Sequence, residues 1–209
     1  MRFETRFVKY LTDEEFGIIM DYLEARQSPS FKLLIKFMAV LALRVSDATT
    51  LKADSLQDNC THIIYQDYKT KIFHDKQLPR FLTREAQAYF SQYKHRFRNG
   101  FLFFPEKSPN EHIKASTVRA FFVDMRRKFG WNQPYYIQKN GKNLYRISPH
   151  TLKHYCLHKF YKASGNDLAA TKTFSGHLEM KHTIRYIETL ESRNNQSLIL
   201  EKAFESAMT

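Results

Sequence analysis

Residues 148–154 read Ser-Pro-His-Thr-Leu-Lys-His and introduce a helical pattern that ends before Gly165. The spacing of apolar residues predicts a helix over residues 151–164, because glycine commonly follows the last residue of a helix. Two imidazoles and one ammonium group therefore stand where this helix begins. Ionisable residues also stand beside the ends of other predicted helices and strands. These ends are therefore the candidate positions for a functional site.

Helical patterns dominate the remainder of the chain. The capping box Thr12-Asp13-Glu14-Glu15 predicts the start of a helix over residues 13–26. Ser30 and Thr83 are the expected N-caps of two later helices. A short helix with Ser46 as its cap is expected to end near Leu51. The further helices are expected over residues 31–43, 84–97, 116–129, 167–175, 179–190 and 197–207.

Strand patterns are few and short. Residues 61–65 and 76–81 are expected to form a hairpin around a polar turn, and residues 101–104 to be extended. Residues 131–147 are expected to form a long loop or a weak hairpin. The chain has only 6 Gly and 6 Pro in 209 residues, which leaves little room for a β-sandwich. The predicted fold class is mainly α with a small antiparallel β-sheet (α+β).

The composition favours an anionic polymer as the partner. The chain has 33 Lys+Arg against 21 Asp+Glu, a net charge of +12, and yet 43% of its residues are hydrophobic, which excludes disorder of the whole chain. The longest apolar stretch, residues 31–43, is too short and too charged to cross a bilayer, so no membrane partner is expected. Two cysteines and the lack of a secretory signal indicate an intracellular protein with free thiols.

Ionisable residues gather at four places whose chemistry is complementary. Cleavage of a phosphodiester without a metal requires cations on the non-bridging oxygens, a nucleophile, a proton donor and a proton acceptor. The four places supply all of these groups, and they are Arg44 after the second helix, Lys69 and Lys71 in the hairpin turn, His150 to His154, and Ser175-Gly176-His177 followed by Tyr186.

In their order and spacing these places resemble the catalytic domain of the tyrosine recombinases, the lambda-integrase family. Ala42-Leu43-Arg44-Val45-Ser46-Asp47 resembles the family box G-L-R-x-S-E, and residues 148–154 resemble P-H-x-L-R-H. Phe174-Ser175-Gly176-His177 resembles the L-G-H box, and Thr183-Ile184-Arg185-Tyr186 resembles T-x-x-Y, at the family's usual interval after the histidine. The resemblance extends from Leu11 to Tyr186.

The resemblance implies a role for each matching residue. Arg44 would clamp the scissile phosphate, and Tyr186 would attack it to form a 3′-phosphotyrosyl bond. A hairpin lysine would protonate the leaving 5′ oxygen, with Lys69 preferred over Lys71 because Lys69-Thr70 matches the common K-T pair. His150 and His177 would accept a proton and bind the phosphate. The implied partner is double-stranded DNA, bound by a homo-oligomer of four protomers, with no metal and no other cofactor.

Two departures from the family pattern stand out. The second arginine of the family is Lys153 here, which retains a positive charge but loses the planar fork that binds phosphate through two hydrogen bonds. Arg146 and Arg185 are candidates to supply that fork. Only about ten residues precede the capping box, so we expect one catalytic domain over residues 1–190 without a separate N-terminal DNA-grasping domain. Residues 191–209 are expected to be a linker and a helix exchanged between protomers.

Other residues admit competing interpretations. His150, His154 and His158 share one helix face, but no Cys, Asp or Glu cluster accompanies them, so a zinc site is not expected. The aromatic series from Phe90 to Phe104 has the spacing of a core rather than of a base-stacking surface. Basic side chains in two runs are expected to contact DNA phosphates, and they are Arg96, Arg98, Arg126, Arg127 and Lys128.

Two functions remain open at this stage. One is a site-specific recombinase that cleaves and rejoins DNA through a phosphotyrosyl bond, and this one is favoured because Arg44, His150, His177 and Tyr186 are all present. The other is a DNA-binding relative with weakened catalysis, which Lys153 would mark. A type IB topoisomerase, which uses the same chemistry to relax DNA, is a more distant alternative.

Overall fold

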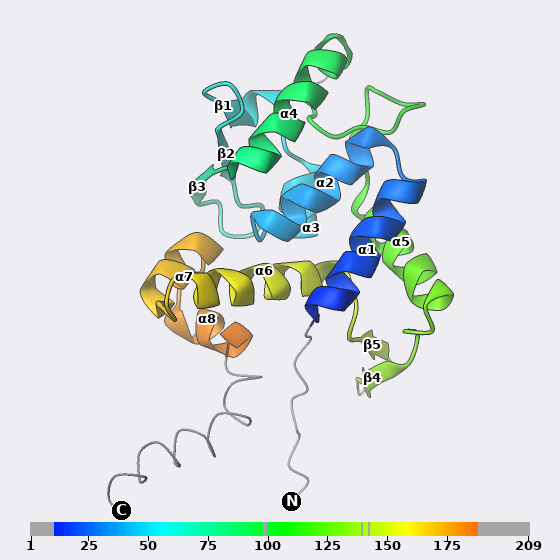
Figure 1. The fold of residues 1–209 in the computed structure, drawn as a ribbon, viewed down its shortest axis with the longest axis vertical. Coiled ribbons are helices and arrows are strands. Elements are labelled where there is room, and N and C mark those ends of the chain that lie inside the picture. Colours follow the sequence, from blue (N-terminus) through cyan, green and yellow to red (C-terminus); the bar gives the residue numbers. More distant parts are fainter. Residues whose placement is uncertain (1–10, 98–99, 139, 142, 188–209) are drawn as a thin grey trace, which may run out of the picture. The chain divides into compact units, whose positions relative to one another are not determined.

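The computed structural model describes residues 11–97, 100–138, 140–141 and 143–187. These residues belong to two compact units, the larger being Tyr10–Cys156 and the smaller containing the described residues from Leu157 onward. Helices with small antiparallel sheets make up the fold (Figure 1), as the sequence predicts. Within the described residues, no helix is both long and apolar enough to span a membrane.

Helix α1, Asp13–Arg26, has the bounds that the capping box predicts. The Thr12 hydroxyl accepts a hydrogen bond from the Glu15 N–H at 3.1 Å, and the Glu15 carboxylate accepts one from the Thr12 N–H at 3.0 Å. Both donors lack a partner within the helix, so this reciprocal pair fixes the starting residue.

Helix α2, Pro29–Val40, begins earlier than predicted and has a different cap. Ser28 is the N-cap and accepts a hydrogen bond from the Phe31 N–H at 3.4 Å. Pro29 then occupies the first turn, where its fixed φ suits a helix. Ser30, the expected cap, is buried instead, and its hydroxyl accepts hydrogen bonds from the Phe104 N–H and the Tyr89 hydroxyl.

A three-stranded antiparallel sheet follows the short helix α3, Val45–Thr49. Its strands are β1, Leu56–Gln57, β2, His62–Gln66, and β3, Phe73–Gln77, in the order β1-β2-β3. Strand β3 begins at Phe73 rather than at the predicted residue 76, because the turn closes early: the Asp67 N–H donates to the Ile72 carbonyl at 2.9 Å.

The remaining elements of the larger unit match the predicted order. Helix α4 begins three residues before the expected cap Thr83, whose hydroxyl donates to the Leu78 carbonyl instead. Phe101 makes only an isolated bridge, to Lys52, and the weak hairpin is present. The bounds are Arg80–Tyr93 for α4, Ala115–Lys128 for α5, Pro134–Ile137 for β4 and Asn143–Tyr145 for β5, with 3-10 turns at Ala53–Ser55 and Lys94–Arg96.

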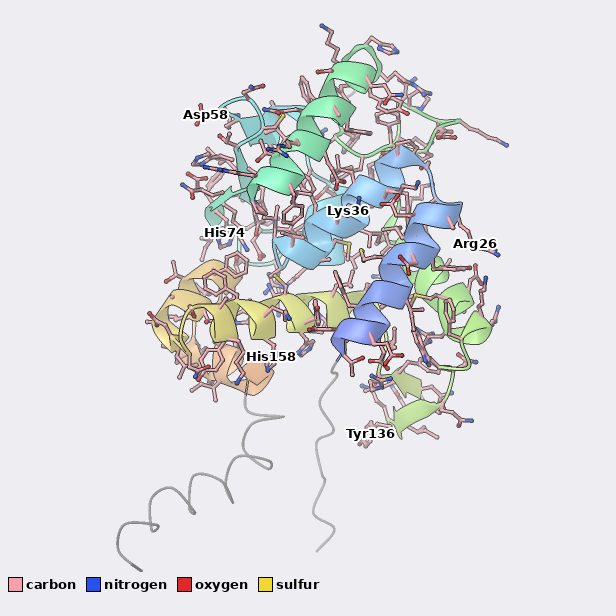
Figure 2. The ribbon with its side chains drawn as sticks, in the orientation of Figure 1. Arg26, Lys36, Asp58, His74, Tyr136 and His158 are labelled. Atoms are coloured by element: carbon pink, nitrogen blue, oxygen red, sulfur yellow. The ribbon has the colours of Figure 1, made fainter. Side chains whose placement is uncertain are left out.

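Helix α2 lies at the centre of the core of the larger unit. Phe37 is fully buried, and its ring meets Phe103 edge-on at 5.4 Å between centroids. Phe104 is also buried, so the aromatic series contributes to the core as expected. On the outer side of α2, Lys36 (Figure 2) forms ion pairs with Glu24 of α1 and Glu85 of α4, both at 2.7 Å. Helix α2 is thereby tied to both neighbouring helices.

The smaller unit consists of the end of α6, Pro149–Ala163, and the helices α7, Leu168–Ser175, and α8, Met180–Ile187. Asp167 caps α7 by accepting hydrogen bonds from the N–H groups of Ala169 and Ala170. Gly176 ends that helix with a φ of 69°, the left-handed conformation that glycine adopts without strain. The predicted helix over residues 197–207 lies outside the described residues.

Candidate active site

Arg44 stands in the connection between α2 and α3. The preceding residue pair, Ala42-Leu43, is buried, and Ala42 has a φ of 54°. Glycine, which the recombinase box has at this position, adopts that conformation freely, whereas a side chain costs about 1–2 kcal/mol there. The sharp turn follows Leu41, the C-cap residue of α2, and leaves Arg44 as the N-cap residue of α3, with about a quarter of its side chain exposed.

Two buried carboxylates face the Arg44 guanidinium. Asp67, from the end of β2, forms a close hydrogen-bonded ion pair with Nη1 of Arg44, and Asp47 lies 3.8 Å from the same nitrogen. Burial alone raises the pKa of the Asp67 carboxyl, but hydrogen bonds from the Thr70 and Lys69 N–H groups and the charge of Arg44 bring it below its ordinary value. The position of the guanidinium is therefore fixed by these two carboxylates.

Lys69 and Lys71 lie in the turn between β2 and β3, both with exposed side chains. The Lys69 N–H donates to Oδ1 of Asp67 at 2.9 Å, and the Lys71 N–H donates to the Asp67 carbonyl at 2.9 Å. Lys71 has a φ of 60°, and its ammonium lies 4.7 Å from the centre of the Tyr68 ring. The turn thus attaches both candidate lysines to the residue that pairs with Arg44.

Lys153 is buried beside this group, with 2% of its surface exposed. Its pKa falls from the usual 10.5 to about 7, because burial disfavours the charged form and the charges of Arg44 and Lys76 add to that effect. The charges of Asp47 and Asp67 act in the opposite direction and favour the protonated lysine, as a bound anion would.

Lys76 is a member of this site that sequence reasoning missed. Its side chain is buried on the inner face of β3, opposite Ile63, and its ammonium donates to the Leu41 carbonyl at 2.7 Å. Burial lowers its pKa to about 8. The signal was present in the strand alternation: Lys76 and Leu78 share the inward face, so a lysine stood in a core position.

His150 and Arg146 are two further candidates, and the structure gives the surroundings of each. His150 is exposed on the first turn of α6, its ring edge-on to His154 at 4.7 Å between centroids. Arg146 is bound to the Glu15 carboxylate through both Nη atoms. This pair joins Arg146 to the start of α1.

The basic residues expected to bind DNA divide into buried and exposed members. Arg126 is buried, donates to the Ile147 carbonyl at 2.9 Å and stacks over the Tyr145 ring, so its expected DNA contact is replaced by a structural role. Arg96 donates to the Glu106 carbonyl and remains partly exposed. Arg127 and Lys128 are exposed on α5, and Arg98 lies outside the described residues.

In the smaller unit, His177 is buried behind the C-terminus of α7. Its N–H donates to the Ser175 hydroxyl at 3.1 Å, and Nδ1 of its ring lies 3.1 Å from the Thr183 hydroxyl. Thr183 is fully buried on α8, and Tyr186 follows it by one helical turn, its side chain lying outside the described part. The threonine of the T-x-x-Y box therefore anchors the histidine of the other box, a function that the sequence did not suggest.

The structure thus assembles two groups, each within its own unit. Arg44, the hairpin lysines and Lys153 belong to the larger unit, whereas His177 and Tyr186 belong to the smaller one. Across the described residues, no three His, Cys, Asp or Glu side chains are arranged to hold a metal ion. Cys60 and Cys156 are buried free thiols.

Comparison with known proteins adds an independent line of evidence. The family model described as phage integrase family matches residues 9–193. A search of curated proteins found no match. Among solved structures, the XerA recombinase has a TM-score of 0.67 at 16% identity, with 96% of this chain and 65% of that chain covered.

Two DNA-bound structures are similar to the same degree. XerH recombinase bound to its difH substrate before cleavage has a TM-score of 0.67 at 16% identity over 94% of this chain and 55% of that chain. A lambda integrase dimer bound to a COC′ core site has a TM-score of 0.67 at 14% identity over 92% of this chain and 51% of that chain. The chain therefore spans between about half and two thirds of these proteins, and the likeness is one of fold.

Proposed function

The chain belongs to the phage integrase family, the tyrosine recombinases, and from that membership we propose that it is a site-specific DNA recombinase acting through a 3′-phosphotyrosyl intermediate. The observation that carries the proposal is the convergence of cations around Arg44. Arg44, Lys76 and Lys153 face two carboxylates, Asp47 and Asp67, so the protonated site has an excess of one positive charge. One phosphodiester carries a single negative charge, which would balance this excess.

The reaction divides among the chain's own residues. The Tyr186 hydroxyl attacks the scissile phosphorus, giving its proton to His150 or His177, while the bond from phosphorus to the 5′ oxygen breaks. Lys69 gives a proton to that oxygen, which leaves as a 5′-hydroxyl. Arg44 and Lys153 stabilise the charge that develops on the non-bridging oxygens. Rejoining is the same sequence in reverse, with the phosphotyrosyl bond conserving the energy.

The alternative, a DNA-binding relative with weakened catalysis, is favoured by one observation, the lysine at position 153. A nicked-duplex trap separates the two functions without knowledge of the target. A pool of duplexes of random sequence, each nicked so that the short cleaved strand diffuses away, is incubated with the protein and denatured. DNA that remains attached to protein is sequenced. Enrichment of one sequence supports the recombinase, and recovery no higher than with Tyr186→Phe supports the binding protein.

The lowered pKa of Lys153 predicts proton uptake on DNA binding. At pH 8 a lysine with a pKa of about 7 is mostly neutral, and a phosphate beside it restores the charged form, so binding should take up close to one proton. At pH 6 the lysine is already charged, and its uptake should disappear. Calorimetry of the captured duplex in two buffers of different ionisation enthalpy gives the number of protons, with Tyr186→Phe as background to prevent cleavage.

The control for this measurement is a permanent charge. Lys153→Arg should lose the Lys153 share of the uptake at pH 8, while Lys159→Arg, an exposed lysine on the same helix, should retain it. Equal uptake by Lys153→Arg and the parent would show that Lys153 does not meet the phosphate.

We also propose that protomers assemble on paired DNA sites as a homo-oligomer of four, in an intracellular setting. Arg96, Arg127 and Lys128 are the proposed contacts to flanking phosphates. The chain after residue 194 is the proposed connection to a neighbouring protomer. Deleting it should leave binding of one protomer to DNA within about twofold and weaken larger complexes at least tenfold, as a gel-shift titration would record. Unchanged larger complexes would contradict the connection.

A further inference from the structure

Asp67 connects Arg44 to the turn that carries the hairpin lysines, and its two carboxylate oxygens have different partners. Oδ2 pairs with Nη1 of Arg44. Oδ1 accepts hydrogen bonds from the N–H groups of Lys69 at 2.9 Å and Thr70 at 2.8 Å. One side chain therefore spans the distance between the arginine and the hairpin turn.

The backbone of Asp67 closes the same turn. Its N–H donates to the Ile72 carbonyl and its carbonyl accepts from the Lys71 N–H, both at 2.9 Å. Asp47 adds a second connection, because its Oδ1 accepts a hydrogen bond from the Tyr68 N–H at 3.0 Å. The segment between β2 and β3 is thus attached to the residues beside Arg44 along its first half, although the side chains of Tyr68 and Lys69 are exposed.

We infer that Asp67 is a positioning residue that fixes the hairpin lysine relative to Arg44. The inference rests on the proposed function and extends it, since the arginine holds the phosphate and the lysine must reach the oxygen that leaves it. A proton donor contributes about 10²–10⁴-fold to rate when placed within hydrogen-bond reach. A displacement of about 1 Å can cost about 10²-fold. An exposed turn without such an attachment would not maintain that placement.

Two substitutions separate the functions of the two oxygens. In Asp67→Asn the remaining carbonyl oxygen can still accept from Lys69 and Thr70, while the amide no longer pairs with Arg44. In Asp67→Ala both sets of contacts are lost. Asp75→Asn is the matched control, because it removes an exposed carboxylate from β3 of the same hairpin, one that lies 3.2 Å from the His62 imidazole.

The rate of adduct formation on the captured nicked duplex is measured with oxygen and with sulfur at the 5′ bridging position. A thiolate leaves without a proton, so the sulfur substrate does not need the lysine. In Asp67→Ala the rate of adduct formation on the oxygen substrate should fall about 10²-fold or more below the parent rate. On the sulfur substrate the deficit relative to the parent should be at least tenfold smaller. Asp67→Asn, which retains the turn, should recover much less. Asp75→Asn should match the parent on both substrates.

Equal losses of Asp67→Ala on the two substrates would overturn the inference, because Asp67 would then act on Arg44 alone. Hydrogen exchange of the Lys69 and Thr70 amides provides a readout that does not depend on activity. Their protection should fall at least tenfold in Asp67→Ala and stay unchanged in Asp75→Asn, and unchanged protection in Asp67→Ala would also overturn it. If the parent protein forms no adduct, the proposed function is refuted. The hydrogen-exchange measurement would still test whether Asp67 fixes the turn, because it does not depend on activity.

Discussion

Tyr186→Phe is expected to abolish the covalent protein–DNA adduct, a loss of at least about 10³-fold in the rate of its formation. Phenylalanine retains the ring but has no hydroxyl to attack phosphorus. Tyrosine has an ordinary pKa near 10, so the reaction depends on the cations and the proton acceptor around the phosphate as much as on the residue itself. The adduct is measured by denaturing electrophoresis of labelled, nicked duplex.

The control for this variant is another tyrosine. Tyr161→Phe removes a hydroxyl from a partly buried side chain of α6 in the same unit, and should form adduct at the parent rate. DNA affinity should be the same for both variants within about threefold. Adduct formed by Tyr186→Phe would assign the nucleophile to a different residue and would contradict the mechanism.

Arg44→Ala is expected to have the second largest effect, lowering the rate of adduct formation by about 10²–10³-fold. The substitution removes the fork that would bind the phosphate, and it also removes the guanidinium that pairs with Asp67 and lies 3.8 Å from Asp47. Like charges at a buried site destabilise the fold, and we expect the free energy of unfolding to fall by about 1–3 kcal/mol. Chemical denaturation measures this cost separately from the rate.

Arg44→Lys separates charge from geometry. It retains a cation beside the two carboxylates, so the stability should return to within about 1 kcal/mol of the parent, while the rate stays low because a lysine cannot form two parallel hydrogen bonds to a phosphate. A rate equal to the parent's would show that charge alone is enough. A lysine would then be sufficient at position 44, as the proposed mechanism requires of the lysine at position 153.

Local signals explain the parts of the fold that the sequence predicts well. Helix α1 has its predicted bounds because the capping box involves only neighbouring residues. Ser30 was assigned as a cap because nothing near it in sequence reveals that its hydroxyl receives the Phe104 N–H. The predicted start of strand β3, residue 76, is too late in the chain because a hydrogen bond from the Asp67 N–H closes the turn. The position of Asp67 is in turn fixed by its contact with Arg44, which is distant in sequence.

The same distinction applies to the site. Arg44 and Lys153 were identified through a resemblance of short boxes, and the structure places both in one charged group. Asp67 belongs to no box, and its contacts reach a residue 23 positions away. Arg126 belongs to the basic run of residues 126–128, which predicts a surface position, but its guanidinium donates to the carbonyl of the distant Ile147. Charge counts in sequence do not reveal which cations are buried.

Helix α6 sets a limit on how this protein can be dissected. The division between the two units falls within the helix, after Cys156, so Lys153 and the last turns before Ala163 belong to different units along one continuous helix. A boundary inside a helix offers no natural cleavage point, since both new ends would expose unsatisfied backbone groups. An expression fragment intended to isolate the Arg44 site must therefore extend through Ala163, and limited proteolysis should cut elsewhere first.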